Sequence, residues 1–292
     1  MVKRKKALFE TFAKLSARQK PRRYKIGLAL SGGVAYGIAQ VGVLKVLEKA
    51  GIRPDCIAGT SSGSLIAAGY AAGLSVKQLE ALSIHTSWKQ LFALRPSSVG
   101  LVSSEPIATY VRENFHVSDF SQLKIPLAVV ATDICSGEEA VFTEGPLDRA
   151  VRASCSIPGV YGPVELAGCQ LVDGGLAENV PVQALKSMGA DLIIAVNVMG
   201  HPQVFKKASN LVQIMTRVWN FFIQQNRVWR KKADVILEPD LRIFDLFDFS
   251  AVPDIIRVGE REAKSRLPEM KRAIKRRDSL RQKIKGISKY SI

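Results

Sequence analysis

The sequence predicts an α/β fold with a mostly parallel central sheet. Short apolar runs of strand length alternate with amphipathic stretches at helical spacing, and glycine-rich turns follow several of the strand-like runs. Because a helix between two strands returns the chain to the same edge of a sheet, this alternation favours parallel strands. The 292 residues, 47% of them hydrophobic, are sufficient for one large core.

The first half of the chain alternates strand and helix. Ile38, Val41 and Leu44 recur at helical spacing and belong to a predicted helix that Gly51 ends. The stretch from Ser75 to Gln78 has the form of a capping box and predicts the start of another helix. The predicted elements are strand 25–30, turn 31–33, helix 35–49, strand 55–58, helix 62–72 and a helix from residue 75.

The second half adds hairpins to this alternation. Ser104 and Pro106 have the spacing of a helix cap followed by an early proline. The predicted elements are a helix from 104, strand 127–132, a turn at 136–137 into strand 140–142, a hairpin of 164–166 with 170–172, a helix between Pro181 and Gly189, strand 192–198 and a helix over 253–285.

Positive charge is concentrated at the two ends of the chain. The formal net charge is +16, of which residues 1–25 supply ten Lys or Arg against Glu10, and residues 257–292 supply thirteen against four acidic residues. Nucleic-acid enzymes more often spread basic groups over a folded face, so we expect no nucleic-acid partner. We expect the basic ends to contact an anionic membrane surface; solvated tails are the alternative.

Several classes of protein are disfavoured. No stretch approaches the ~20 apolar residues that cross a bilayer, and Glu10 and Lys14 interrupt the region where a signal peptide would be apolar. We therefore expect a cytoplasmic protein, peripheral at the inner face of the cytoplasmic membrane. The cysteines lack paired short spacing, so we expect no disulfide, metal or cofactor and interpret them as small core residues. They are Cys56, Cys135, Cys155 and Cys169.

A candidate nucleophile lies between a predicted strand and a predicted helix. Ser61 has glycine two residues before it and two residues after it, which is the Gly-x-Ser-x-Gly form of a nucleophile elbow. Side chains at Gly59 and Gly63 would collide with the backbone of so sharp a turn. The Ser61 hydroxyl would project at the N-terminus of the following helix, where backbone dipoles favour negative charge.

The turn at Gly32 and Gly33 and the segment at Asp173 also follow predicted strands. In an open parallel sheet, the strand ends form the crevice that binds ligands. Acyl transfer requires a nucleophile, a base and donors for the oxyanion of the tetrahedral intermediate. Asp173, which precedes two glycines, is the candidate base, and the N–H groups near Gly32 and Gly33 are candidate donors. A free aspartate with a pKa of about 3.9 is a weak base, so the site would have to exclude water.

A histidine base is the alternative. His201 follows Ser61 and Asp173 in the chain order of ordinary Ser-His-Asp hydrolases and is the histidine that fits a triad. We interpret His85 and His116 as surface or capping residues.

These motifs resemble those of the patatin-like phospholipases, especially their compact bacterial members. The match extends over residues 24–200 and, more loosely, 233–239. The resemblance implies a three-layer α/β/α sandwich that hydrolyses fatty-acyl esters of lipids with a Ser-Asp dyad and no histidine. On the matching positions Ser61 is the nucleophile and Asp173 the base, and the oxyanion loop falls on Gly32, Gly33 and Val34. The matching stretches are 30–33, 42–47, 59–63, 150–154 with 157–159, and 173–176 with Asn179 and Pro181.

Two positions depart from the family's pattern. Val34 is β-branched and resists the backbone angles that glycine allows, and Tyr36 stands where the family usually has arginine. We expect a serine acyl-ester hydrolase of phospholipase A type acting on a lipid or acyl ester. The alternative is a non-catalytic lipid- or acyl-binding regulatory protein. The sequence leaves the oligomeric state open.

The resemblance divides the chain into a basic arm (1–23), a patatin-like domain (24–268) and a basic tail (269–292), where we expect disorder or membrane contact beyond Arg276.

The segment 208–229 has an apolar stripe with basic ends, which is typical of a core-covering helix and of an interfacial helix. We interpret residues 211–218 as core-facing. We expect Trp219, Phe222 and Trp229 at the crevice mouth. Phe244, Phe247 and Phe249 would join them there; a bent surface loop is the alternative, which the alternating Asp245 and Asp248 favour.

Overall fold

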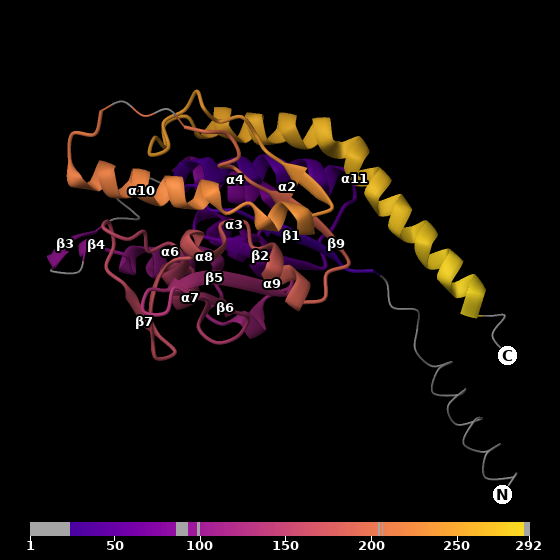
Figure 1. Cartoon of the computed structure of the whole chain (residues 1–292), viewed down its shortest axis with the longest axis horizontal. Coiled ribbons are helices and arrows are strands. Elements are labelled where there is room, and N and C mark those ends of the chain that lie inside the picture. Colours follow the sequence, from indigo (N-terminus) through magenta and orange to yellow (C-terminus); the bar gives the residue numbers. More distant parts are fainter. Residues whose placement is uncertain (1–23, 86–92, 98–99, 204, 206, 289–292) are drawn as a thin grey trace, which may run out of the picture.

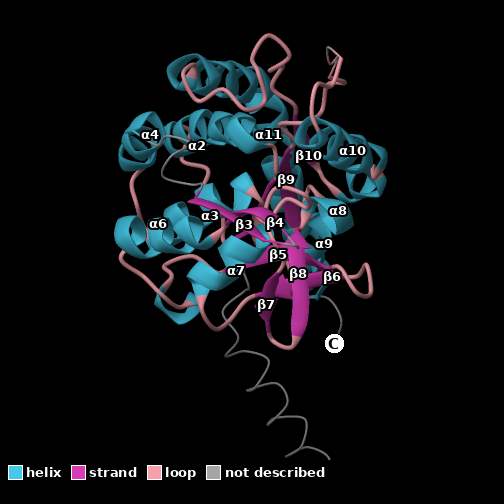
Figure 2. Ribbon diagram, turned by 90° about the vertical axis from the view of Figure 1, so that its left-hand side faces the viewer, coloured by secondary structure: helices cyan, strands magenta, loops and turns pink. Residues whose placement is uncertain are grey.

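A central sheet lies between two layers of helices in the computed structural model, which describes residues 24–85, 93–97, 100–203, 205 and 207–288 (Figure 1). Figure 2 shows helices on both sides of the strands. The strands of this sheet are β1 (Ile26–Leu30), β2 (Cys56–Thr60), β5 (Leu127–Asp133), β6 (Glu139–Phe142), β7 (Val164–Leu166), β8 (Cys169–Asp173), β9 (Leu192–Val196) and β10 (Val235–Leu237), and β3 (Ala93–Ser97) with β4 (Gly100–Ser103) forms a separate hairpin.

The sheet is parallel on one side and antiparallel on the other. Its strand order is β10-β9-β1-β2-β5-β8-β7, and β6 pairs with β5. The strands from β10 to β5 run parallel, whereas β6, β8 and β7 join by antiparallel pairing. Parallel strands require crossover helices, whereas the β7–β8 pair needs only the two-residue turn at Ala167 and Gly168. The predicted α/β class with three layers is confirmed.

Alternate residues of the same strands supply two cores. Leu28 and Leu30 of β1 face the larger core, and Ala29 between them faces the smaller one. The larger core holds side chains of α2 (Ala39–Lys49), α3 (Ser62–Ala72), α4 (Val76–His85), α6 (Glu105–Phe115), α7 (Leu147–Ser154) and α11 (Val252–Ser288). The smaller core is covered by α9 (Val182–Ser187) and the 3-10 helix η3 (Val228–Lys232).

The remaining helical elements are short or lie outside the two cores' main helices. They are the 3-10 helices η1 (Val34–Ile38) and η2 (Phe120–Gln122), the short α8 (Gly175–Glu178) and α10 (Leu211–Gln225). The helix predicted over 35–49 is divided in the structure into η1 and α2. Short 3-10 segments are common at the N-termini of α-helices.

The long helix α11 crosses α2 at two glycines. A Cβ atom on Gly42 would collide with the carbonyl oxygen of Ile256, and one on Gly259 would collide with that of Ala39. The helix bends part-way along its length (Figure 1) and contains Pro268, which lacks the N–H of a regular helical hydrogen bond.

The helix α11 also continues through the boundary that we placed at residue 268 and past Arg276, where we expected disorder or membrane contact. The basic arm 1–23 and residues 289–292 of the tail lie outside the described residues. Within the described ranges, no helix is both long enough and apolar enough to cross a bilayer.

Candidate active site

Ser61 occupies the sharp turn between β2 and α3. Its φ of 51° and ψ of −128° are rare for a residue with a side chain. Such strain persists only where the surrounding structure holds it, and it is common at functional sites. The Ser61 side chain is 3% exposed and lines an apolar pocket. The strand-to-helix turn predicted from the Gly-x-Ser-x-Gly frame is present.

The two glycines of this frame make the turn sterically feasible. A Cβ atom on Gly59 would lie 2.6 Å from Cα of Ser64, and a Cβ atom on Gly63 would collide with the carbonyl oxygen of Leu30. In both cases the obstacle is backbone, which cannot rotate away.

Ser154, at the end of α7, connects this turn to neighbouring strands. The N–H of Ser61 donates a hydrogen bond to Oγ of Ser154 at 2.8 Å, and the Ser154 hydroxyl donates to the carbonyl oxygen of Val130 at 2.5 Å. The carbonyl oxygen of Ser154 accepts from the N–H of Gly174 at 3.3 Å. One buried residue therefore contacts the Ser61 turn, strand β5 and the segment that follows Asp173.

Asp173 ends β8 and is 0% exposed. Its Oδ1 accepts a hydrogen bond from the N–H of Gly175 at 2.8 Å. Burial raises the pKa of Asp173 to about 7, and the Ser61 hydroxyl, the Gly175 N–H and the Trp219 indole each oppose that rise. The structure thus brings Asp173 within interaction range of Ser61, at a position with no solvent-exposed surface.

The Asp173 carboxylate is nevertheless incompletely paired. Its Oδ2 and the indole N–H of Trp219 have no hydrogen bond of normal geometry with any described residue. Catalytic hydrogen bonds are often loose before substrate binds. One carboxylate oxygen of Asp173 is therefore buried without a partner among the described residues.

The glycine-rich turn after β1 presents two free backbone donors. The N–H of Gly32 donates to the carbonyl oxygen of Asn179 at 3.3 Å. The N–H groups of Gly33 and Val34 have no hydrogen-bond partner among the described residues. Gly32 is also close to the nucleophile, since a Cβ atom there would lie 2.9 Å from Cβ of Ser61.

Val34 and Tyr36 have different structural consequences. Val34 has a φ of 48°, which is strained for a β-branched residue. Tyr36 is 0% exposed, and its hydroxyl donates to the carbonyl oxygen of Phe244 at 2.6 Å. The N–H of the intervening Ala35 donates to the carbonyl oxygen of Leu246 at 3.2 Å, so this segment is tied twice to residues 241–251.

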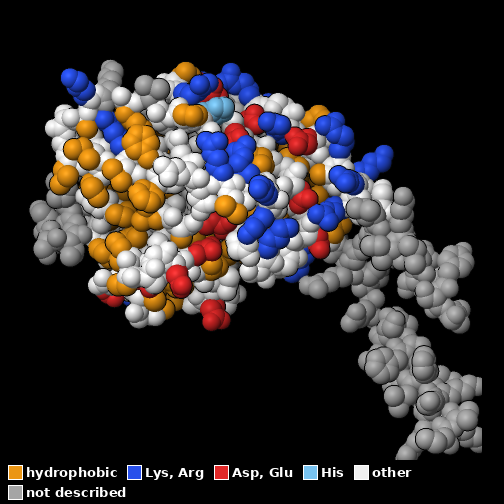
Figure 3. All heavy atoms as spheres, in the orientation of Figure 1, with side chains coloured by type: hydrophobic (Ala, Val, Ile, Leu, Met, Phe, Trp, Pro, Cys, Tyr) orange, Lys and Arg blue, Asp and Glu red, His pale blue; other side chains and the backbone are white. Residues whose placement is uncertain are grey.

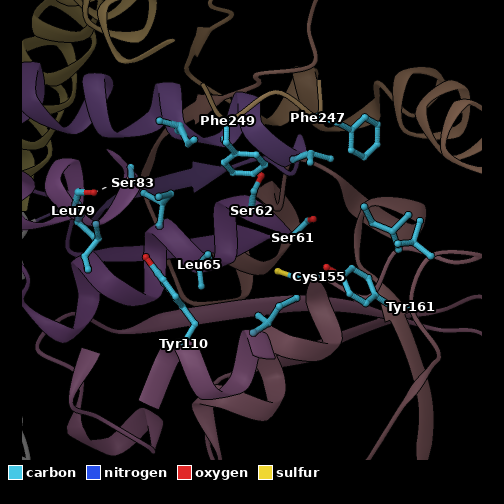
Figure 4. A pocket seen from close by; sticks show the side chains of 18 of the residues that line it. Ser61, Ser62, Leu65, Leu79, Ser83, Tyr110, Cys155, Tyr161, Phe247 and Phe249 are labelled. Carbon is cyan, nitrogen blue, oxygen red and sulfur yellow. Dashed lines mark hydrogen bonds between the residues drawn. The ribbon is translucent and has the colours of Figure 1, made fainter. Parts of the chain in front are cut away.

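A cavity of about 110 Å³ extends from Ser61 into the larger core (Figure 4). Its walls come from η1, α3, α4, α6, the segment 155–161 and the loop that carries Phe247 and Phe249. The Ser83 hydroxyl in the wall donates to the carbonyl oxygen of Leu79 and is therefore satisfied. A narrow apolar cavity with Ser61 in its wall suits a hydrocarbon chain.

The sequence profile of a family described as patatin-like phospholipase matches residues 28–186, which is more than half of the chain and includes both Ser61 and Asp173. The chain belongs to the patatin-like phospholipase family.

Named proteins with related sequences are longer than this patatin-like chain. An uncharacterised NTE family protein of Mycobacterium tuberculosis is 37% identical over 178 residues, which are 60% of this chain and 49% of that protein. A lysophospholipase of Aspergillus niger is 28% identical over 279 residues, which are 85% of this chain and 18% of that protein. The chain thus spans at most about half the length of these relatives.

A solved structure is also similar. VipD from Legionella pneumophila aligns with a TM-score of 0.46 and 11% identity over 84% of this chain and 67% of that chain.

Within the described part of the chain, no histidine is among the groups that shift the pKa of Asp173 or among the residues that line the Ser61 cavity. The His201 ring is within hydrogen-bond distance, 3.2 Å, of the carbonyl oxygen of Glu238, and His201 does not line the Ser61 cavity. His85 is the exposed last residue of α4, and His116 is the C-cap of α6, so their interpretation as surface and capping residues is confirmed.

The interpretation of the cysteines is only partly right. Cys56 and Cys155 are buried, as expected for core residues, but Cys135 is exposed and Cys169 half-buried. Cys135 lies in the turn between β5 and β6, which the sequence placed at residues 136–137.

Sequence reasoning missed the positions of several residues around the site. Ser154 was recognised only as part of a motif, because a serine at a helix end has no signal for two tertiary hydrogen bonds. Trp219 and Trp229 were expected at the crevice mouth, but they are 3% and 4% exposed. Residues 211–218 were expected in the core, but Leu211, Ile214 and Val218 are exposed.

Proposed function

We propose that this chain is a serine hydrolase of lipid acyl esters, of phospholipase A type, with Ser61 as nucleophile and Asp173 as base. One observation carries the proposal. A strained serine opens onto an apolar cavity beside a fully buried aspartate whose pKa is raised to about 7. A pKa near the working pH makes a carboxylate a better proton acceptor.

In the first half of the reaction, Oγ of Ser61 attacks the ester carbonyl carbon while Asp173 takes the hydroxyl proton. The carbonyl electron pair moves to oxygen, where the N–H groups of Gly33 and Val34 are the proposed donors. Collapse of this tetrahedral intermediate breaks the C–O bond of the ester. The leaving alcohol takes the proton from Asp173, and the acyl chain remains on Ser61.

In the second half, Asp173 takes a proton from water as the water attacks the acyl-enzyme. Collapse of the second intermediate releases the fatty acid, and the proton returns to Oγ of Ser61. The apolar cavity would hold the acyl chain in both steps.

The relatives support a lysophospholipid as substrate. The Aspergillus niger protein is named a lysophospholipase, and its match covers 85% of this chain. A lysophospholipid carries a single acyl chain, and the cavity of about 110 Å³ that Ser61 lines is small for two acyl chains. We therefore propose that lysophospholipids are hydrolysed faster than diacyl phospholipids.

The experiment combines fluorophosphonate labelling with fatty-acid release from lysophosphatidylcholine. Ser61→Ala should lose both signals, because it removes the hydroxyl that would react with the probe and with the ester. Asp173→Asn should retain the fold and slow fatty-acid release by on the order of 10³-fold, the usual contribution of a general base. Ser121→Ala, an exposed serine, is the matched control.

Two other results would change the proposal. If His201→Ala lost activity while Asp173→Asn kept it, a histidine would be the base. If wild type bound lysolipid but gave neither labelling nor fatty acid, the chain would be a lipid-binding regulatory protein, as the strained Val34 would then suggest.

A further inference from the structure

The two faces of α10 differ in their surroundings. The inner face is buried: Trp219, Asn220 and Ile223 are at most 4% exposed. The outer face carries large apolar side chains at three- and four-residue steps, and each is between 43% and 68% exposed. We call these residues the α10 outer face: Leu211, Ile214, Val218, Phe221 and Phe222.

Apolar exposure is concentrated at this place. Ten large hydrophobic side chains are exposed in the described part of the chain, and half of them belong to the α10 outer face. Figure 3 shows hydrophobic side chains gathered on the side of the molecule where α10 lies. Single exposed apolar residues are normal, whereas a contiguous patch marks an interaction surface.

The charge of this region indicates the chemistry of the partner. The sequence has no acidic residue between Asp191 and Asp234, whereas seven Lys or Arg occur there. Exposed Lys207 precedes α10 and exposed Arg227 follows it. On the helix itself, the Arg217 guanidinium lies 5.1 Å from the ring centre of Phe205, which makes an edge contact with Phe221. An apolar stripe with basic ends is complementary to an anionic lipid surface.

The inner face of the same helix packs against the candidate active site. The Trp219 indole is close enough to Asp173 to oppose part of the rise in its pKa that burial causes. A Cβ atom on Gly175 would lie 3.0 Å from Cγ2 of Ile223. Just beyond the helix, Asn226 donates a hydrogen bond to the carbonyl oxygen of Ala177 at 2.9 Å. A surface that held α10 would therefore also hold the segment that carries the proposed base.

We propose that the α10 outer face binds an anionic lipid bilayer, with the helix lying in the plane of the headgroups. The apolar side chains would enter the boundary between headgroups and acyl chains, and the basic groups at both ends would meet lipid phosphates. The benefit of docking rests on the proposed function, since it would bring lipid substrates to the cavity at Ser61. The binding itself requires no hydrolysis.

The test measures vesicle binding of the full chain in a Ser61→Ala background, so that hydrolysis cannot alter the lipid. Vesicles contain phosphatidylcholine with about 30% phosphatidylglycerol as the anionic lipid. Val218→Asp places a charge on the α10 outer face. Val141→Asp on β6 is the matched control, because both valines are 43% exposed.

We expect Val218→Asp to weaken partitioning by about tenfold or more, because a carboxylate would have to enter the apolar boundary of an anionic membrane. Val141→Asp should change it by less than about twofold. Thermal unfolding of both variants checks that each is folded. Equal partitioning of the two variants would overturn the proposal.

A salt series separates α10 from the basic ends of the chain. At about 0.5 M salt, attraction between exposed charges is largely screened. The remaining binding should still differ between Val218→Asp and Val141→Asp. A second outcome would also overturn the proposal: a lipid-free dimer that Val218→Asp dissociates would assign the α10 outer face to a second copy of the chain.

Failure of docking and failure of the proposed function are distinguishable. Wild type that hydrolyses a soluble short-chain ester without binding vesicles would retain the proposed function and lose the docking surface. If Ser61→Ala protein bound vesicles through α10 and wild type were inactive, the docking surface would be retained and the proposed function lost.

Discussion

Asp173 is fully buried, and its surroundings decide what its carboxylate can do. Burial disfavours the charged form and raises its pKa to about 7, although a backbone N–H donates to one carboxylate oxygen. The other oxygen has no partner among the described residues. This combination suits a base that must accept and return one proton.

The pKa of Asp173 predicts the pH dependence of hydrolysis. The proposed base acts only when it is deprotonated, so kcat/KM for a soluble ester should rise with pH, level off above about 7, and fall about tenfold for each pH unit well below that value. The check is a pH–rate profile from about pH 5 to 9. A histidine is the other common group that titrates in this range.

His201→Ala is therefore the control for this profile, and it should leave the inflection in place. A profile without an inflection near neutrality would show that no group with this pKa controls the reaction.

At the scale of elements, residues 241–251 form one wall of the cavity. Phe247 and Phe249 line it, and the hydrogen bonds from Ala35 and Tyr36 fasten their loop to the start of η1. Tyr36 therefore contributes a tether at the position where the family usually has a positive charge. Its fully buried ring and short hydrogen bond make this tether specific.

Tyr36→Phe should release this wall. The Phe244 carbonyl would lose its donor, so we expect KM for a long-chain ester to rise about fivefold, equivalent to ~1 kcal/mol of lost hydrogen bonding. The measurement compares KM for long-chain and short-chain esters, because a short chain would depend less on the cavity wall.

Tyr70→Phe is the matched control for this substitution. Burial raises the pKa of both tyrosines to about 12, but the Tyr70 hydroxyl interacts with Glu48 instead of the cavity wall. Equal KM changes in the two variants would mean that the tether does not act on the cavity.

At the scale of the whole molecule, buried carboxyl groups make stability depend on pH. Burial, followed by the neighbouring Glu139, raises the pKa of Glu178 to about 8. Burial raises the pKa of Glu139 as well. Below about pH 4 these groups are protonated in both the folded and the unfolded chain. As pH rises from there to about 8, the unfolded chain releases its protons first, and the free energy of unfolding falls.

Glu178→Gln should therefore stabilise the chain at alkaline pH. Glutamine can still accept the hydrogen bond that Gln183 N–H donates, and it has no proton to lose. We expect the difference in melting temperature, variant minus wild type, to be more positive at about pH 8 than at about pH 5. Thermal unfolding at the two pH values measures this difference. Glu165 is exposed, so Glu165→Gln should differ from wild type by the same amount at both pH values. If the same were true of Glu178→Gln, the prediction would be contradicted.

Much of the fold was predictable because its signals are local. The helix predicted over 62–72 agrees with α3, and the hairpin of 164–166 with 170–172 agrees with β7 and β8 to within a residue at each end. Glycines at 59 and 63 indicated the sharp turn at Ser61 because few other residues fit it. The short strand β10 and the hairpin of β3 and β4 were not predicted. The strand β10 forms by pairing with β9, and β3 forms by pairing with β4. The spacing of apolar residues along the chain carries no information about such pairing.

The α10 segment shows where such reasoning stops. Its apolar residues have helical spacing on more than one face, so periodicity alone does not say which face is buried. Packing against α8 and Gly175 decided it, and it placed Trp219 inside and the α10 outer face in solvent.

By itself the sequence determined the α/β class, the turn at Ser61 and the residues that are candidates for catalysis, because steric rules and spacing act over a few neighbouring residues. Only the tertiary structure decided which polar groups are buried beside each other. Asp173 acquires its pKa near neutrality, Tyr36 its partner and α10 its exposed face from segments far away in the chain, and burial is a property of the assembled core.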